Sequence, residues 1–326
     1  MKATAVAPSN IAFTKYWGKK DESLRIPLNS SVSVNLSNLL TTTTVEFSPD
    51  YEKDVIVYNS LQRKGERSEK RVIEHVDRVR KLSRLKEKVR IVTVTNFPSA
   101  AGLASSASGF AALTVAASSA AGLQLSEKKL SILARLGSGS ACRSIPDGFV
   151  EWLDGRTNER SYAVSIFPPS YWNLSITAVI ISKEQKGISS TLGQQLLVSN
   201  TFLPVRLARM KEKNRLVKKY ITQKRFTQFG ELVEMEALEL HAMTLTSSPP
   251  IIYWQPDTVK MMKLVQTWRK EGLEVYFTID AGPNIFLICE EKNQQKLIKK
   301  LIKNNLKDFI VNKPSAGARL ISRHLF

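Results

Sequence analysis

The segment that most constrains the fold is residues 103–121, which are rich in alanine and include no charged side chain. An apolar, strand-like run at residues 89–95 precedes it, and Gly122 stands where a left-handed residue would end a helix. A helix that is apolar on all its faces is stable only when other elements surround it. The sequence therefore predicts a buried helix that is entered from a strand through a short loop.

The loop that joins this strand to the helix has the composition of a phosphate-binding loop. Gly102 and Ala104 leave room for the backbone to approach a polyphosphate, and the helix N-terminus offers N–H groups and a partial positive charge. Ser105 and Ser106 add hydroxyls that suit phosphate oxygens or a phosphate-bound magnesium ion. The loop is not a Walker loop, because no Gly-Lys-Ser/Thr follows at the required spacing. The alternative is a helix whose small residues only allow close packing.

Length and composition predict a globular protein of two lobes that share a cleft. The 326 residues exceed one ordinary domain, and 43% hydrophobic with 24% charged residues is typical of soluble chains. No apolar segment follows Met1-Lys2, so we expect neither a signal peptide nor a membrane partner. Cys142, Cys289 and three scattered histidines favour a reducing, cytoplasmic location over a disulfide framework or a metal cluster.

The net charge of +19 comes largely from segments with helical periodicity. Residues 69–86 and 296–307 each combine an apolar stripe with a basic face, and residues 206–225 hold nine basic side chains and one acid. A solvated basic surface explains this pattern. The alternatives are a nucleic-acid surface and a positive field that gathers a polyanionic small molecule. No nucleic-acid motif accompanies the charge, so we expect no nucleic-acid partner.

The β-rich part of the chain lies before residue 184. Residues 30–36 and 41–47 are predicted as two antiparallel strands joined by a polar turn at Ser37-Asn38. We expect an N-terminal lobe of residues 1–184 and a C-terminal lobe of residues 185–326, with the boundary in the polar segment 182–190.

The pattern beyond that boundary is mainly helical. Residues 202–221 and 226–243 are predicted as a helical hairpin with complementary, exposed charge, which adds little stability. A helix over residues 257–271, capped by Asp257, and a strand–turn–strand around residues 280–284 follow. Helices beside such strands predict an α+β lobe.

A lysine pair follows the first strand. Lys15 and Lys19 are four residues apart and would point the same way in a helical or turn geometry. Two ammonium groups in one cleft repel each other unless an anion lies between them, which favours a phosphate or carboxylate ligand. The alternative is a basic surface turn that Trp17 anchors in the core.

Two further clusters carry polar groups beside turn-forming residues. Residues 137–144 suit an anion-binding loop in which Arg143 holds a carboxylate bidentately, and the alternative is a flexible Ser/Gly linker. Asp280 is the first residue of the segment 280–284, and an ordinary turn also explains the composition of this segment. A carboxylate at this strand end, beside Lys15, would serve as a general base. Together the clusters fit phosphoryl transfer from a nucleotide to a carboxylated, anionic small molecule.

At these residues the chain resembles the diphosphomevalonate decarboxylases, a branch of the galactokinase, homoserine kinase and mevalonate kinase superfamily. The phosphate loop alone would indicate only the superfamily, whereas residues 15–19 (Lys-Tyr-Trp-Gly-Lys) and 137–144 point to this branch. The matching segments fall in order along the chain: residues 10–12, 15–19, 27–31, 100–108, 137–144, 148–152 and 280–284.

The resemblance implies a two-lobed fold, with a phosphate loop in a βαβ-type N-terminal lobe and a ferredoxin-like α+β C-terminal lobe. It implies ATP-dependent decarboxylation of mevalonate 5-diphosphate to isopentenyl diphosphate, with ATP and Mg²⁺, in a homodimer. The tertiary hydroxyl is phosphorylated first, and loss of that phosphate then drives release of carbon dioxide. The alternatives are a monophosphate-specific decarboxylase, a mevalonate 3-kinase and a non-enzymatic basic protein.

The resemblance also implies roles for individual residues. Asp280 orients or deprotonates the hydroxyl, Lys15 stabilises developing charge and Arg143 holds the substrate carboxylate. The remaining residues bind the two substrates: Tyr16, Lys19, Ser138, Ser140 and Ser190 contact mevalonate diphosphate, whereas Gly102, Ala104, Ser105, Ser106 and Lys186 contact the nucleotide, with Ser106 beside its magnesium ion.

Overall fold

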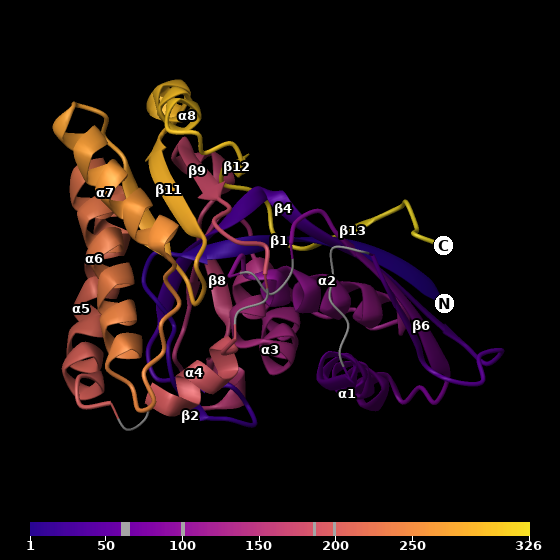
Figure 1. Cartoon of the computed structure of the whole chain (residues 1–326). Helices are drawn as coiled ribbons and strands as arrows, with labels where there is room; N and C mark the ends of the chain where they lie inside the picture. The colour runs from indigo at the N-terminus through magenta and orange to yellow at the C-terminus, as the bar shows by residue number, and fades with distance from the viewer. Residues whose placement is uncertain (60–65, 99–101, 185–186, 198–199) are drawn as a thin grey trace.

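The computed structural model describes residues 1–59, 66–98, 102–184, 187–197 and 200–326. Two sheets, each with its own helices, lie side by side in the molecule (Figure 1). None of the helices within these ranges is long and apolar enough to cross a membrane. The mixed architecture confirms the predicted α+β class.

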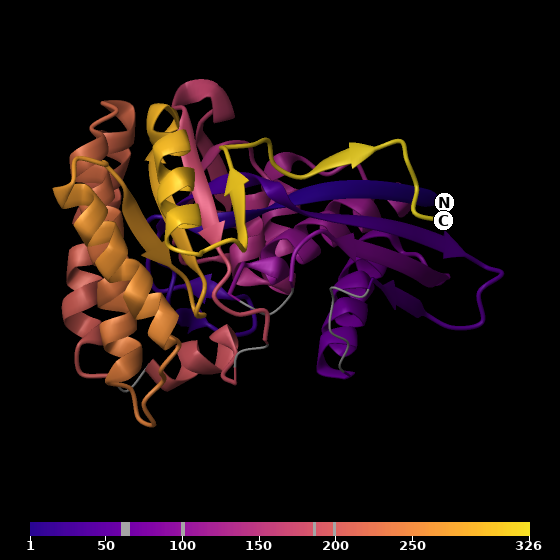
Figure 2. The same cartoon turned by 45° about the horizontal axis from the view of Figure 1, so that its top comes forward.

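The larger sheet has the order β13-β1-β4-β6-β5, and β7 and β8 extend it from β4. The β5–β6 pair is parallel, whereas the other pairs are antiparallel. Figure 2 shows β13 beside β1, with the two termini at the same end of the molecule. The strands are β1 (Lys2–Ala12), β4 (Ser31–Ser48), β5 (Val55–Tyr58), β6 (Lys88–Thr95), β7 (Phe149–Trp152), β8 (Ala163–Phe167) and β13 (Arg319–Ile321).

The predicted alanine-rich helix is α2 (Ser105–Ala120), and it packs against β1 and β4. Ala112 and Ala116 of α2 share one core with Ala5 of β1 and Val45 of β4. Such small side chains let helix and sheet approach closely, so larger residues there would overpack the core. The same part of the fold contains α1 (Glu66–Ser83), α3 (Glu127–Gly137) and the 3₁₀ turns η1 (Gly139–Ser144), η2 (Asn158–Arg160) and η3 (Pro169–Tyr171).

The second sheet has the order β10-β11-β9-β12. Helices α5, α6 and α7 stand side by side along it (Figure 1). Its elements are β9 (Leu174–Val179), α5 (Leu203–Thr222), α6 (Phe226–Leu245), α7 (Pro256–Lys270), β10 (Tyr276–Ile279), β11 (Ile285–Glu290), η5 (Glu291–Asn293), α8 (Gln294–Lys303) and β12 (Phe309–Asn312). Outside both sheets lie the ribbon of β2 (Lys19–Asp21) with β3 (Ile26–Pro27) and the short helix α4 (Ser190–Leu196).

The division of the chain after residue 184 stays a prediction. Two strands pair across it: β9 joins β11 and β12, whereas β13 returns to β1.

The predicted turn at Ser37-Asn38 is wrong, because β4 continues through both residues as one strand. The Ser37 N–H donates to the Lys313 carbonyl at 3.1 Å, and the Asn38 N–H donates to Asn312 Oδ1 at 2.9 Å. Backbone groups that a turn would have satisfied locally are thus paired with a segment from the far end of the chain.

The start of α7 also differs from the prediction, because Gln255 and not Asp257 is its N-cap. Gln255 and Thr258 form a reciprocal capping box, and Pro256 occupies the first helical position. Asp257 lies in the first turn, where its charge still complements the helix dipole.

Candidate active site

A cavity of about 600 Å³ opens between the two sheet-and-helix parts of the molecule. Residues from β1, α2, η1, α4 and the β10–β11 turn line it. Lys186 lies outside the described residues. Every other predicted site residue is in the lining: Lys15, Tyr16, Lys19, Gly102, Ala104, Ser105, Ser106, Ser138, Ser140, Arg143, Ser190 and Asp280.

The centre of the cavity is an ion pair between Lys15, just after β1, and Asp280, just after β10. Lys15 Nζ donates to Asp280 Oδ1 at 2.7 Å and to the Ala12 carbonyl at 2.8 Å. The Lys15 side chain is 3% exposed, whereas that of Asp280 is 23% exposed. Burial lowers the pKa of Lys15, and the Asp280 charge opposes this effect. The pair leaves one edge of the carboxylate open to the cavity, where it can accept a proton.

Arg143 is buried in η1 and reaches the cavity wall. Its Nε donates to Asn10 Oδ1 at 3.2 Å, and its Nη1 donates to Ser31 Oγ at 2.7 Å. Burial lowers the pKa of Arg143, although an arginine stays charged at neutral pH. Two of the three guanidinium nitrogens therefore already donate to protein groups. The guanidinium is thus not wholly open to a ligand carboxylate, as the predicted bidentate contact assumed.

Asn10 is a site residue to which the sequence analysis gave no role. Its Nδ2 donates to Ser144 Oγ at 2.8 Å and to the Ser140 carbonyl at 3.2 Å, while its Oδ1 accepts from Arg143. Asn10 thereby fixes η1 and the guanidinium together. The available signal was a polar residue near the end of a buried strand, five positions before Lys15.

Lys15 and Lys19 both line the cavity, but each already has its own carboxylate partner. Lys19 Nζ is 2.9 Å from Glu22 Oε2, and its side chain is 2% exposed. Asp280 and Glu22 separately offset the two charges, so repulsion between the ammonium groups does not by itself require an anion, and the anionic ligand stays a prediction. Burial lowers the pKa of Lys19, and the Glu22 contact opposes this shift.

Tyr16 lies beside this lysine pair and packs on Trp152, with ring centroids 4.5 Å apart. A Cβ at Gly139 would stand 2.9 Å from the Tyr16 hydroxyl, so this glycine lets η1 approach the ring. Burial raises the pKa of Tyr16, which keeps the phenol a hydrogen-bond donor.

The described part of the phosphate loop has an unusual backbone. Gly102 has φ +84°, and a Cβ there would stand 2.9 Å from the Gly282 Cα in the β10–β11 turn. Ala104, which precedes α2, is left-handed at φ 54° and makes no side-chain capping bond. The first turn of α2 contains no acidic residue. This arrangement fits an anionic group at the helix N-terminus.

Ser106 connects the phosphate loop to η1, because its Oγ lies 3.2 Å from Ser138 Oγ. Its hydroxyl fits a phosphate oxygen or a magnesium ion carried by phosphates, since hard cations prefer oxygen ligands. No group of three or more His, Cys, Asp or Glu that could hold a metal occurs in the described ranges.

Two buried charges on the helical hairpin also belong to the site, although neither lines the cavity. Glu236 Oε1 accepts the Lys15 N–H at 3.0 Å, and Arg206 Nη2 donates to the Lys15 carbonyl at 3.1 Å. The predicted hairpin and its complementary charge are confirmed, but the expected exposure is wrong for this pair, because both side chains are buried. Glu236 shares the apolar face of α6 with Phe229 and Val233, and a carboxylate at such a position was the signal.

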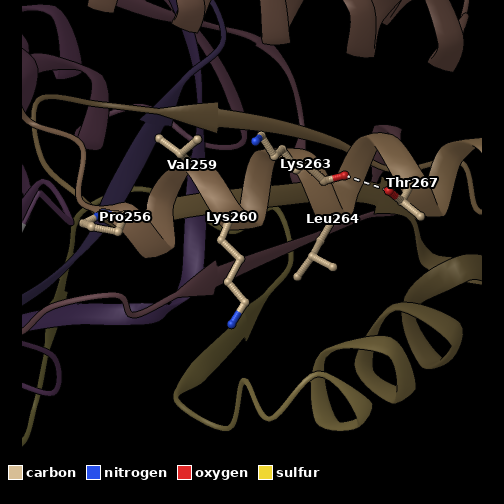
Figure 3. Close-up of a pocket in the computed structure, with 6 residues that line it drawn as sticks. All are labelled: Pro256, Val259, Lys260, Lys263, Leu264 and Thr267. Carbon is tan, nitrogen blue, oxygen red and sulfur yellow. Dashed lines mark hydrogen bonds between the residues drawn. The ribbon is translucent and has the colours of Figure 1, made fainter.

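A second, smaller hollow lies on α7 (Figure 3) and contains none of the predicted residues. Its volume is about 390 Å³, and its six lining residues all come from this one helix. The polar contact drawn there is local, from the Thr267 hydroxyl to the Lys263 carbonyl at 3.1 Å. We therefore place the active site in the larger cavity.

The chain is similar to known proteins along most of its length. Residues 7–163 match the family model described as diphosphomevalonate decarboxylase-like N-terminal domain, and residues 176–316 match that of the mevalonate 5-diphosphate decarboxylase C-terminal domain. The diphosphomevalonate decarboxylase of Candida albicans is 39% identical in an alignment of 320 residues that covers 93% of this chain and 88% of that protein.

Solved structures of similar proteins extend the likeness to the whole fold. The mevalonate diphosphate decarboxylase of Enterococcus faecalis superposes with a TM-score of 0.92 at 37% identity, covering 99% of both chains. Another structure, MDDEF in complex with MVAPP, AMPPCP and magnesium, has a TM-score of 0.92 at 36% identity, with 99% of each chain covered. This chain therefore belongs to the diphosphomevalonate decarboxylase family.

Proposed function

We propose that this protein converts mevalonate 5-diphosphate and ATP into isopentenyl diphosphate, ADP, phosphate and carbon dioxide, a step of isoprenoid synthesis in the mevalonate pathway. The observation that carries the proposal is the Lys15–Asp280 ion pair, with Arg143 lining the same cavity. Family membership and the resemblance to a structure that contains MVAPP, AMPPCP and magnesium support it.

Asp280 acts first in the proposed reaction. Its open edge accepts the proton of the substrate's tertiary hydroxyl, whose oxygen forms a bond to the terminal phosphorus of ATP as the bond to ADP breaks. Lys15 holds the carboxylate in place at 2.7 Å and stabilises the charge that develops on the transferred group.

Decarboxylation follows without a further protein nucleophile. The bond from the tertiary carbon to the new phosphate breaks, and inorganic phosphate leaves with the electron pair. The bond between the carboxylate carbon and the neighbouring methylene carbon then breaks. Its electron pair forms the new double bond between the methylene and the tertiary carbon, and carbon dioxide leaves. Arg143 orients the carboxylate from the cavity wall, with Asn10 and Ser31 holding the guanidinium.

The other lining residues bind the anionic ends of the two substrates. Gly102 and Ala104 present backbone to the nucleotide phosphates beside Ser105, while Ser106 would hold a phosphate-bound Mg²⁺, which neutralises phosphate charge. Tyr16, Lys19, Ser138, Ser140 and Ser190 are proposed for the substrate diphosphate, and Lys186 stays a prediction for the terminal phosphate of ATP.

A homodimer in the cytoplasm, without membrane or nucleic-acid partners, completes the proposal. Light scattering of the purified protein tests the dimer, since a monomer mass at micromolar concentration would contradict it. Nucleic-acid binding that falls steeply with salt would contradict the proposed absence of that partner.

The reaction is tested by supplying Mg-ATP and mevalonate 5-diphosphate and by measuring ADP, phosphate and carbon dioxide in one sample. The proposal expects equal amounts of the three products. ADP without carbon dioxide would identify a 3-kinase, and the absence of all three would refute the proposed activity.

A further inference from the structure

We propose that Glu236 and Arg206, on the α5–α6 hairpin, are positioning residues that set Lys15 against Asp280 by holding the Lys15 peptide groups. This inference rests on the proposed function, because its readout is the turnover in which Lys15 takes part. Neither residue touches the cavity, so each acts through Lys15.

The hairpin holds Lys15 by its backbone on both sides of the residue. The Lys15 N–H donates to Glu236 Oε1 at 3.0 Å, and the Lys15 carbonyl accepts from Arg206 Nη2 at 3.1 Å. Arg206 Nη2 also pairs with Glu236 Oε1, so the two members of one ion pair bind the N–H and the carbonyl of the same residue, Lys15. A loop residue held at both its donor and its acceptor has little freedom to shift its side chain.

The ion pair is fully enclosed. Glu236 is 0% exposed and Arg206 is 4% exposed. Lys213 Nζ binds the other carboxylate oxygen, Glu236 Oε2, at 2.7 Å. Burial alone would raise the pKa of Glu236, but the charges of Arg206 and Lys213 outweigh burial and hold it below its usual range. Glu236 is therefore ionised at neutral pH.

Stability alone is a poor explanation for these buried charges. Replacing a buried ion pair by apolar residues of similar volume is often neutral or stabilising, because desolvation costs about as much as the pair returns. The contacts with Lys15 give the pair another role. A misplacement of about 1 Å at a reacting group can cost on the order of 100-fold in rate.

Glu236 also contributes charge to the environment of Lys15. The charged and titratable groups that face Lys15 include Asp280 after β10, Arg143 of η1, Arg206 of α5, and Glu236 and His241 of α6. Burial lowers the pKa of Lys15, Arg143 lowers it further, and Asp280 and Glu236 raise it. Loss of the Glu236 charge therefore leaves Lys15 easier to deprotonate, which a purely structural role would not predict.

The test compares Glu236→Gln with Glu239→Gln. Glu239 lies three residues further along α6 and pairs with Arg209, Lys213 and, at 3.9 Å, Arg206, so its substitution removes the same charge from the same cluster. The contacts of Lys15 described above do not include Glu239. We expect Glu236→Gln to lower kcat by about 10- to 100-fold, with KM for both substrates within about 3-fold of wild type. Glu239→Gln should stay within about 3-fold in both parameters.

The pH profile of kcat provides the second readout. In Glu236→Gln the basic limb of the kcat profile should move to lower pH by about one unit, because Lys15 loses its proton more easily. In Glu239→Gln this limb should stay at the wild-type pH. If Glu236→Gln does not fold, the charge-balanced variant Glu236→Gln/Lys213→Met carries the same test, because it removes one buried anion with one of its cations.

Two results have different meanings. An active wild type with equal kcat and equal basic limbs in Glu236→Gln and Glu239→Gln overturns the positioning role and leaves the proposed function intact. A wild type that releases no carbon dioxide refutes the proposed function itself.

Discussion

The Lys15 ammonium lies 2.7 Å from the Asp280 carboxylate, although 265 positions separate the two residues in the sequence. The two sheets produce this contact, because Lys15 follows β1 of one sheet and Asp280 follows β10 of the other. The cavity therefore exists only where the two parts of the fold meet. Its chemistry depends on how accurately they hold this pair.

Asp280→Asn should abolish turnover while keeping the fold. Asparagine still offers Lys15 a carbonyl acceptor, but it cannot take the hydroxyl proton, so kcat should fall by about 1,000-fold or more. Steady-state kinetics and the thermal unfolding midpoint measure the two effects. Asp257→Asn, at an exposed position in α7, is the control and should leave kcat unchanged. Residual activity within 10-fold of wild type would remove Asp280 from the proton transfer.

Arg143→Lys should lower kcat by about 100-fold, because a single ammonium nitrogen does not reproduce the planar guanidinium, which uses separate nitrogens for Asn10, Ser31 and the substrate carboxylate. The loss should appear in kcat more than in KM for ATP, since Arg143 is proposed to hold the carboxylate of the other substrate. Arg156→Lys, at an exposed position, controls for the change of side chain. Unchanged kinetics in Arg143→Lys would contradict the carboxylate role.

Gly102→Ala should impair use of ATP. The new Cβ would stand 2.9 Å from the Gly282 Cα, so the phosphate loop and the Asp280 turn would have to separate. We expect KM for ATP to rise by about 10-fold, on the order of the 1.4 kcal/mol that a tenfold change represents. Gly272→Ala is matched in backbone, at φ +87°, but has open space around it. Equal kinetics in the two variants would show that the close approach has no functional effect.

Stability should fall in mild acid because of a buried histidine. His75 is fully buried, its Nε2 lies 2.8 Å from Thr114 Oγ1, and burial followed by nearby arginines lowers its pKa to about 3. The unfolded chain binds the proton near pH 6.5, so stability is complete above that pH and declines as pH falls toward 3. One such group accounts for about 2 kcal/mol between pH 7.5 and 5.

Urea unfolding at pH 7.5 and 5 measures this loss in wild type and in His75→Gln, whose amide can still meet Thr114. The variant should lose less stability than wild type between the two values. An identical loss in both proteins would exclude His75 as a source of the pH dependence.

Local patterns predicted the elements on which the site is built. Each of these segments carries its own local signal. Small residues mark the helix α2 that follows β6, and paired charges or turn-forming residues mark the segments around Lys15, Arg143 and Asp280. The order of these motifs indicated the family, and the family indicated that Lys15 and Asp280 meet.

The features that were missed depend on contacts between distant residues. The continuation of β4 through Ser37 and Asn38 is held by residues 312 and 313, which no local pattern connects to it. Glu236 and Arg206 were predicted to belong to the exposed charges of the hairpin, because composition does not say which face of a helix a neighbouring element covers. Their role becomes visible only when Lys15 is placed between them.

The most direct test of the account compares mevalonate 5-diphosphate with mevalonate 5-phosphate, each with Mg-ATP, by carbon dioxide release. The account predicts that the diphosphate releases one carbon dioxide per ADP, with kcat/KM at least about 100-fold above that for the monophosphate, on the order of one lost charged contact. An equal or higher kcat/KM for the monophosphate would contradict it and identify a monophosphate decarboxylase.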